Sequence, residues 1–223
     1  GQHQLGGTTL DTNPMRRTID AAGALVDAHH GTTFAVQYLL DANNQPTATA
    51  SGEVLPAQQM LAKQCSTSDG VLIDHQADVL ITNAYPRDHD LWQSFKAIAN
   101  TRFACRQNGV IICLSRCEAA MEGMDVPKFP LGPRGLRRFL RLFGSNGIST
   151  LILRLLPKLA GDAAFFIRMA TQTLQRNPII MVSPILHAAG KFPGLQVVGS
   201  MEEAIEAAKP YLEDGPQRVT VFP

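Results

Sequence analysis

Charged residues are scarce in this 223-residue chain, at 17%, and neither sign is in marked excess. Lys and Arg number 20 against 19 Asp and Glu, so the formal net charge is only +1. Binding to nucleic acid by counterion release needs a surplus of basic residues, so no nucleic-acid partner is expected. With 45% apolar residues, a disordered chain is also excluded. The composition predicts a folded globular protein with a substantial core.

Cysteine is scarce as well. The four cysteines, at positions 65, 105, 113 and 117, form no CxxC pair and no dense disulfide pattern, so we expect buried free thiols. Cys113 and Cys117 lack the spacing of a zinc site, and the six histidines never form H-x-x-x-H or H-x-H. We therefore expect no metal site in this chain.

Long apolar runs and targeting signals are missing too. The longest candidates, 147–161 and 178–189, are interrupted and shorter than the roughly 18 residues that span a bilayer, so we expect no membrane-spanning segment and a cytoplasmic protein. The start, GQHQ, lacks the basic and apolar regions of a signal peptide. Because it also lacks Met, we expect a trimmed or excised piece of a longer protein.

The common catalytic and nucleotide-binding motifs do not occur. No G-x-G-x-x-G follows a strand, no GK[ST] loop is present, and no G-x-S-x-G elbow appears. No catalytic residue in this chain is therefore predicted from a motif.

The N-terminal part of the chain reads as a helix followed by a β-hairpin. Asn13 can cap a helix that begins at Pro14 and ends at His29-His30-Gly31. Strands are predicted over 32–40 and 47–54, joined by a turn rich in Asn and ending in Pro. A helix over 57–65 should follow.

The remainder alternates between strands and helices. A short strand is predicted at 71–74 and a buried one at 77–83, and Asp88 should cap a helix over 89–104. A turn at Asn108-Gly109 then leads into a strand at 110–114, which completes a βαβ unit. The later elements are helices over 162–175 and 201–209 and strands over 179–182, 196–198 and 218–222. We predict a single α/β domain over 1–223, with a mixed, largely parallel sheet, flanking helices and an N-terminal β-hairpin.

A basic segment lies in the middle of the chain. Nine basic residues fall between Lys128 and Arg176, against one acid, Asp162. Leu136, Phe139, Leu140 and Phe143 form an apolar stripe beside three arginines. Such a helix can lie on a membrane or dock a partner, or it can be an amphipathic element of the domain itself. Closure over an anionic cofactor is a third option. We predict a basic, irregular or helical insertion over 127–161.

The segment 85–96 carries the most informative chemistry. It begins where a buried strand ends, and open α/β sheets place ligands at the carboxyl ends of their strands. Gln93, Lys96 and Asn100 share one helical face, on which an amide and an ammonium group can hold a small carboxylate. A solvated polar face beside a packed tryptophan accounts for the same pattern.

Three consecutive runs form a longer pattern: a strand at Ala77–Ile81, then Tyr85-Pro86-Arg87-Asp88, then Leu91-Trp92-Gln93-Ser94-Phe95-Lys96-Ala97. This pattern resembles the C-terminal domain of the nickel-dependent lactate racemase family, in which a strand precedes Tyr-Pro-Lys-Asp and Leu-Tyr-Gln-x-x-Lys-Ala. Other segments resemble the family in the same order: 12–16, 34–40, 50–53, 108–118, 200–205 and 218–223. The resemblance covers about 6–126 well and 195–223 loosely, and leaves 127–194 unaligned.

The resemblance implies a substrate-binding domain. In the family, an N-terminal domain anchors a nickel pincer nucleotide on a lysine and supplies catalytic histidines, and the C-terminal domain closes the cleft. Gln93 and Lys96 would contact the carboxylate or hydroxyl of a small 2-hydroxy acid, with Trp92, Tyr85 and Arg87 as further substrate-binding candidates. The implied reaction takes a hydride from the α-carbon and returns it to either face, which makes the whole protein an isomerase, a racemase or epimerase.

Departures from the family pattern bear on this interpretation. Trp92 replaces a Tyr, Arg87 replaces a Lys, and Asn83-Ala84 replaces a Gly-Gly stretch, so the substrate need not be lactate. Nothing matches the N-terminal half, which is the expected partner. We therefore expect no cofactor and no turnover in this chain alone. The alternative is a non-catalytic small-molecule-binding or protein-interaction domain.

Overall fold

The computed structural model describes residues 13–41, 43–68, 71–119, 131–157, 162–190, 192 and 194–222. Parts of two predicted segments lie outside these residues: 127–130 and 158–161 of the insertion at 127–161, and position 12 of the segment 12–16. The contacts divide the chain into two compact units, Gly1–Leu72 and Ile73–Pro223, where the sequence analysis predicts a single domain. Each unit is described by itself.

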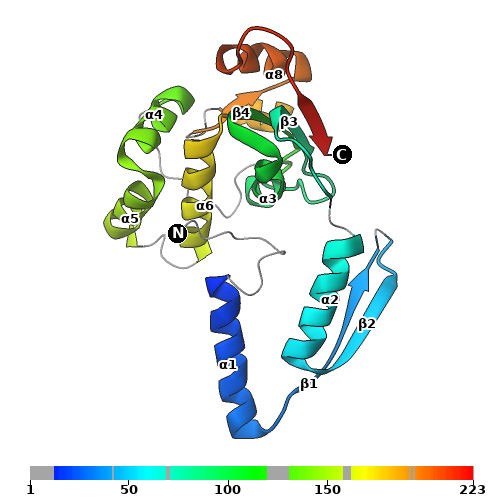
Figure 1. The fold of residues 1–223 in the computed structure, drawn as a ribbon. Helices are drawn as coiled ribbons and strands as arrows, with labels where there is room; N and C mark the ends of the chain where they lie inside the picture. The colour runs from blue at the N-terminus through cyan, green and yellow to red at the C-terminus, as the bar shows by residue number, and fades with distance from the viewer. Residues whose placement is uncertain are drawn as a thin grey trace. The chain divides into compact units, whose positions relative to one another are not determined.

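The first unit contains a helix, a hairpin and a second helix (Figure 1). Its elements are α1 (Pro14–His30), β1 (Phe34–Leu40), β2 (Pro46–Glu53) and α2 (Val54–Ser68). The Asn13 side chain accepts a hydrogen bond of 3.0 Å from the Met15 amide, and Pro14 occupies the first helical turn, which confirms the predicted start of α1. The antiparallel pairing of β1 with β2 confirms the hairpin.

The hairpin has one packed and one exposed face. Ala50 of β2 is buried together with Ala57 and Leu61 of α2, and Leu39 and Ala48 pack against them. The large side chains on the other face of β1 are exposed: Phe34, Val36, Tyr38 and Leu40. The strand thus alternates as a half-covered sheet does.

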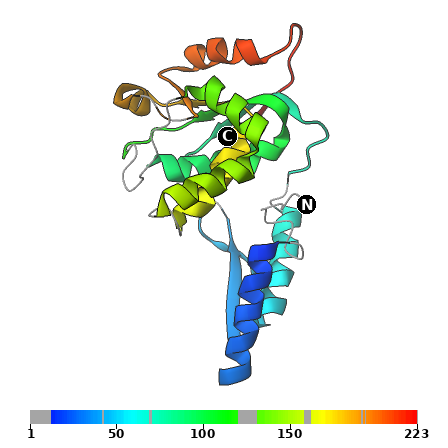
Figure 2. The same ribbon diagram turned by 90° about the vertical axis from the view of Figure 1, so that its left-hand side faces the viewer.

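The second unit is built on a five-stranded sheet (Figures 1 and 2). Its strands are β3 (Ala77–Asn83), β4 (Cys105–Leu114), β5 (Ile179–Val182), β6 (Gln196–Val198) and β7 (Val219–Phe222). They lie in the order β6-β5-β4-β3-β7, and every neighbouring pair is parallel. The predicted α/β class is confirmed. The strand predicted at 71–74 is wrong, because 71–76 adopts no strand.

Helices cover both faces of this sheet. They are α3 (Leu91–Thr101), α4 (Pro133–Phe143), α5 (Ser145–Leu155), α6 (Asp162–Arg176), α7 (Pro184–Ala189) and α8 (Met201–Ala208), with 3₁₀ turns at Arg102–Ala104 and Lys209–Tyr211. Successive strand residues face opposite sides, so Leu80 packs in the core that α3, α4 and α6 cover, and Val79 packs in the core beneath α8. Burial of both faces explains why the strands are almost continuously apolar.

The described part of the basic segment belongs to the α/β unit. Leu136 and Leu140 of α4 are buried in the core, and Arg137 donates a 2.7 Å hydrogen bond to Asn108 of β4. Of the alternatives open from the sequence, the structure therefore favours an amphipathic element of the domain itself.

Strand β4 contains a bulge where the sequence predicts a turn. Ala77 pairs with Cys105 and Val79 pairs with Val110, so extra residues are accommodated in β4 around Asn108, whose φ is 70°. The buried Asn177 amide donates hydrogen bonds of 2.8 Å to the Arg106 carbonyl and 2.7 Å to the Gly109 carbonyl. The turn prediction is wrong because a distant side chain satisfies the carbonyls of the bulge.

Two further findings concern membranes and thiols. None of the helices in the described ranges is long and apolar enough to cross a bilayer, and the cytoplasmic location stays a prediction. Cys105, Cys113 and Cys117 are buried thiols. Burial raises the pKa of Cys105 to about 11.

A glycine-to-alanine change tests the β4 bulge. A Cβ at Gly109 would lie 2.7 Å from the Asp78 carbonyl oxygen and 2.8 Å from the Cys105 sulfur. Gly109→Ala should therefore lower the free energy of unfolding by about 1–3 kcal/mol, measured by urea denaturation. Gly147→Ala in α5 is the control, because a Cβ there meets nothing within 4 Å. A Gly109→Ala protein as stable as the control would contradict this packing.

Candidate functional site

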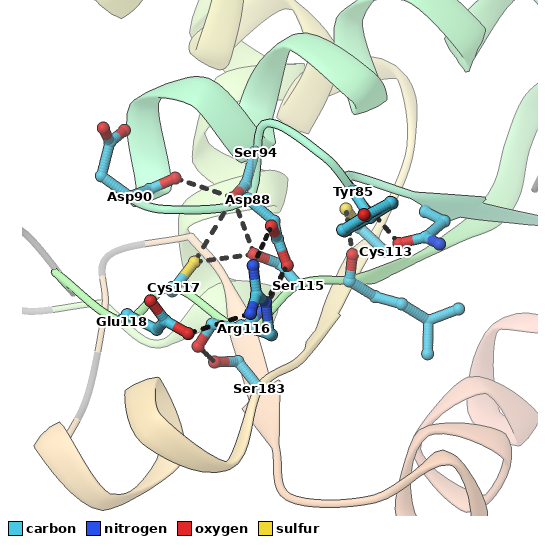
Figure 3. Close-up of polar contacts among 12 residues, drawn as sticks. Tyr85, Asp88, Asp90, Ser94, Cys113, Ser115, Arg116, Cys117, Glu118 and Ser183 are labelled. Atoms are coloured by element: carbon cyan, nitrogen blue, oxygen red, sulfur yellow. Dashed lines mark hydrogen bonds and ion pairs between the residues drawn. The ribbon is translucent and has the colours of Figure 1, made fainter. Parts of the chain in front are cut away.

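Polar residues gather where the parallel strands β3, β4 and β5 end (Figure 3). The loop 84–90 follows β3 and leads into α3, the loop 115–119 follows β4, and Ser183 follows β5. Because the strands are parallel, these segments meet at one edge of the sheet, the edge at which open α/β sheets bind ligands.

A buried carboxylate joins two of these loops. Asp88, whose side chain is only 4% exposed, accepts hydrogen bonds from the Arg116 backbone N–H (3.1 Å), Nε (3.0 Å) and Nη2 (3.3 Å). These bonds from Arg116 hold the pKa of Asp88 below its ordinary value. The Nη1 atom of Arg116 lies 3.1 Å from a carboxylate oxygen of Glu118. The guanidinium is therefore paired with two carboxylates.

The structure corrects the predicted helix cap. Asp88 does not cap α3. Asp90 does so instead, because its Oδ1 accepts a 2.7 Å hydrogen bond from the Gln93 amide. Asp88 is two residues before Asp90, and its carboxylate binds Arg116 instead of an amide of the helix.

Backbone hydrogen bonds continue the connection between the strand ends. The Cys117 amide donates to the Asp88 carbonyl at 2.8 Å, and the Ala119 amide donates to the His89 carbonyl at 2.9 Å. The Ser183 hydroxyl donates to the Arg116 carbonyl at 3.0 Å. The segments after β3, β4 and β5 thus form one connected network (Figure 3).

A small buried cluster fastens α3 to the same network. The Ser94 hydroxyl donates to the Asp90 carbonyl at 2.7 Å, and its oxygen also lies 2.7 Å from the Ser115 hydroxyl. The Cys117 sulfur lies 2.9 Å from the Ser115 oxygen and 3.4 Å from that of Ser94. All three side chains are buried. The first turn of α3 is therefore held from inside the protein.

The structure brings two predicted site residues together. Lys96 Nζ donates a 2.9 Å hydrogen bond to Gln93 Oε1 on the outer side of α3. Trp92 is half-buried and stacks on Phe166 of α6, with ring centroids 4.5 Å apart and planes 17° apart. The indole is thus a packing side chain as well as a neighbour of Gln93.

The other two candidates lie on the loop that precedes α3. Tyr85 is 66% exposed, and its amide donates to Asn83 Oδ1 at 3.1 Å. Arg87 is exposed, and its side chain forms no hydrogen bond or ion pair with the described residues. No contact within the described ranges joins the side chains of Tyr85 and Arg87 to the Gln93–Lys96 pair.

Sequence reasoning missed the residues that hold the site: Asp88 as an ion-pair partner, Ser94, Ser115, Arg116 and Cys117. The only signal was that polar residues follow two buried strands directly. The described residues contain no group of three or more His, Cys, Asp or Glu side chains that could hold a metal ion.

Comparison with known proteins finds a family similarity over part of the chain. Residues 72–129 match the family model of the lactate racemase C-terminal domain. This segment contains β3, α3 and β4, and with them Tyr85, Arg87, Trp92, Gln93 and Lys96. The resemblance to lactate racemase is confirmed.

A solved structure extends the likeness to the fold of nearly the whole chain. The lactate racemase apoprotein from Thermoanaerobacterium thermosaccharolyticum is similar over 96% of this chain, with a TM-score of 0.68 and 18% sequence identity. The chain spans about half, 48%, of the length of that racemase. No curated protein sequence matches the chain.

The pH dependence of stability tests the Asp88–Arg116 pair. Because the folded pKa of Asp88 is lowered, the pair stabilises the protein above the unfolded pKa of about 4, and this stability is lost as the pH falls through the folded pKa. Asp88→Asn should lower the free energy of unfolding at pH 7 by about 1–3 kcal/mol. In urea denaturation between pH 7 and 2.5, the difference from the wild type should shrink toward the acid end. A difference that stays constant with pH would contradict the ion pair.

Proposed function

We propose that this chain is the substrate-binding C-terminal domain of a 2-hydroxy acid racemase or epimerase of the lactate racemase type. Lys96 and Gln93 bind the substrate carboxylate. The observation that supports this proposal is the contact of 2.9 Å between these two side chains, on a helix that starts at the carboxyl ends of parallel strands. Both residues lie within the segment that matches the family model.

The pair suits a carboxylate for chemical reasons. An ammonium group has three protons, and Gln93 accepts one of them, which leaves two for a ligand. No carboxylate in the described ranges pairs with Lys96. The Gln93 amide nitrogen supplies a neutral donor beside the charge, so each oxygen of a carboxylate can receive a hydrogen bond. A substrate held in this way is oriented before it reacts, which can offset several kcal/mol of the barrier.

The remaining candidates shape the rest of the binding site. We assign Tyr85 and Arg87, which are exposed on the loop before α3, to the part of the substrate that lies away from its carboxylate. Trp92 stands where the family has a Tyr and stacks on Phe166, so its indole limits the room beside Gln93. Because of these differences the substrate need not be lactate, and lactate serves as a probe of the class of small 2-hydroxy acids.

The hydride chemistry belongs to the rest of the enzyme. The resemblance implies a nickel pincer nucleotide and catalytic histidines on an N-terminal domain, and the described residues contain no group of three or more His, Cys, Asp or Glu side chains that could hold the metal. The nucleotide supplies the hydride acceptor when it is bound. The role of this chain is to bind and orient the substrate and to close over it.

The N-terminal domain is proposed to cover the exposed face of β1. Phe34, Val36, Tyr38 and Leu40 form a continuous apolar row on a two-stranded sheet. Exposed apolar patches of this kind mark interaction surfaces. The chain spans about half of the similar racemase, so a second half of comparable length is the partner that this row fits. The same row also favours the alternative of a non-catalytic protein-interaction domain.

Removal of Lys96 separates these two functions. In a protein in which the chain is joined to a lactate racemase N-terminal domain, Lys96→Ala should lower racemase activity by roughly a hundredfold, because the substrate loses its charged anchor. The free energy of unfolding should change little, since Lys96 is exposed. Lys63→Ala on α2 is the control and should leave activity unchanged. Equal activity in both variants would contradict the role of Lys96, and a joined protein without racemase activity would favour the interaction domain.

A charge in the apolar row tests the partner surface. Val36→Asp places a carboxylate at a position that is 62% exposed in this chain, so the variant should fold normally. It should weaken binding to a separately expressed lactate racemase N-terminal domain by at least about tenfold, because association would bury the charge. Val221→Asp, at a 60% exposed position of β7, is the matched control. Calorimetry that shows equal affinities for the two variants would contradict the assignment.

A further inference from the structure

We infer that Asp88 and Arg116 are a positioning pair, which fixes the loop 84–90 and the first turn of α3 so that Gln93 and Lys96 face the substrate together. This inference rests on the proposed function. From the sequence, Asp88 is predicted only to cap a helix and Arg116 has no predicted role, and neither residue is assigned to touch the substrate.

The geometry of the pair defines a single orientation. Two guanidinium nitrogens reach the two oxygens of the Asp88 carboxylate, and the backbone N–H of Arg116 reaches one of them as well. A planar fork bound at both carboxylate oxygens resists rotation as well as separation. The carboxylate is buried, whereas the Arg116 side chain is 60% exposed. The pair therefore anchors the loop at its buried side.

The pair is unsuited to hold an anionic substrate directly. Nε and Nη2 of Arg116 contact Asp88, and Nη1 contacts Glu118. Two carboxylates thus surround one guanidinium, and the local charge is negative. Arg116 consequently acts through the loop that it holds and does not bind the substrate carboxylate.

The path from the pair to the binding residues is short. Asp88 precedes the cap residue Asp90 by two positions, and the Asp90 side chain accepts the hydrogen bond of the Gln93 amide. The Cys117 amide, next to Arg116, donates to the Asp88 carbonyl, and the Cys117 sulfur reaches Ser94 in the first turn of α3. A shift of the Asp88 loop therefore changes the direction of the turn that carries Gln93.

A similar ion pair at the opposite end of β3 provides a matched control. Asp78 binds Arg106 of β4 and accepts a 2.8 Å hydrogen bond from the Arg218 amide, and the hydrogen bonds from Arg218 and Arg106 lower its pKa. Like the Asp88–Arg116 pair, the Asp78–Arg106 pair joins an aspartate in or after β3 to an arginine in or after β4. No hydrogen bond or ion pair joins the side chain of Asp78 or Arg106 to the segment 84–96.

The experiment compares two double-mutant cycles in the 223-residue chain. The site cycle is Asp88→Asn, Arg116→Gln and the double variant, and the control cycle is Asp78→Asn, Arg106→Gln and its double variant. Lactate is titrated against each protein while the NMR signal of the Gln93 amide is followed. Hydrogen exchange of the Gln93, Ser94 and Cys117 amides is measured on the same samples.

The site variants should weaken lactate binding by roughly tenfold, and the double variant should be no weaker than either single one, because the two residues act through each other. Exchange of the three amides should accelerate more than the global loss of stability accounts for. The control cycle should lose similar stability and keep the affinity for lactate. Asp88→Asn serves alone if Arg116→Gln fails to fold, since the neutral amide leaves no buried charge without its partner.

Other outcomes overturn the inference. Equal losses of affinity in both cycles would mean that Asp88 and Arg116 matter only for stability, and unchanged affinity in the site cycle would mean that they position nothing. If the wild type binds no lactate, the proposed function loses its support. In that case, hydrogen exchange of the three amides alone tests the positioning pair: faster exchange in the site cycle supports it, and unchanged exchange overturns it.

Discussion

The buried carboxylate of Asp88 is the interaction on which the candidate site depends. A carboxylate removed from water is costly unless hydrogen bonds and an opposite charge compensate it, and Arg116 supplies both through three contacts. The compensation requires the loop after β3 and the loop after β4 to lie side by side. This arrangement of the two loops determines where α3 starts, and therefore where the side chains of Gln93 and Lys96 lie.

The other end of the sheet is stabilised by the same kind of chemistry. Asn177 satisfies the carbonyls of the β4 bulge, and Asp78 ties β3 to Arg106 and to the Arg218 amide. Arg137, from the basic middle of the chain, also bonds to β4. Several charged side chains of this chain thus form hydrogen bonds or ion pairs within the fold. The net charge does not distinguish them from charges available to a partner, so it says little about partners.

The sequence predicted the elements whose causes are local. Alternating or continuous apolar runs defined β3, β5 and β6 with their observed bounds, and Asn13 followed by Pro14 marked the start of α1. The failures have distant causes. The sequence around Asp88 does not show that this carboxylate binds Arg116, 28 positions away, and so does not cap the helix.

The residues of the candidate site also divide into those with local causes, which the sequence predicts, and those with distant causes, which it does not. Helical spacing was enough to place Gln93 and Lys96 on one face, because residues three apart on a helix are neighbours. The cluster of Ser94, Ser115 and Cys117 could not be found in this manner, since it exists only when two loops meet. Trp92 belongs to both groups: its position follows from the family pattern, and its stacking on Phe166 depends on how α3 and α6 pack.

The central claim is that Lys96 and Gln93 recognise a carboxylate, and an NMR comparison of two ligands tests it most directly. Lactate and its neutral amide, lactamide, have nearly the same shape and differ in the charge that Lys96 would bind. Titration of the 223-residue chain should shift the side-chain signals of Lys96 and Gln93 with lactate and leave them almost unchanged with lactamide. Equal shifts with both ligands, or lactate shifts confined to other parts of the chain, would contradict the account.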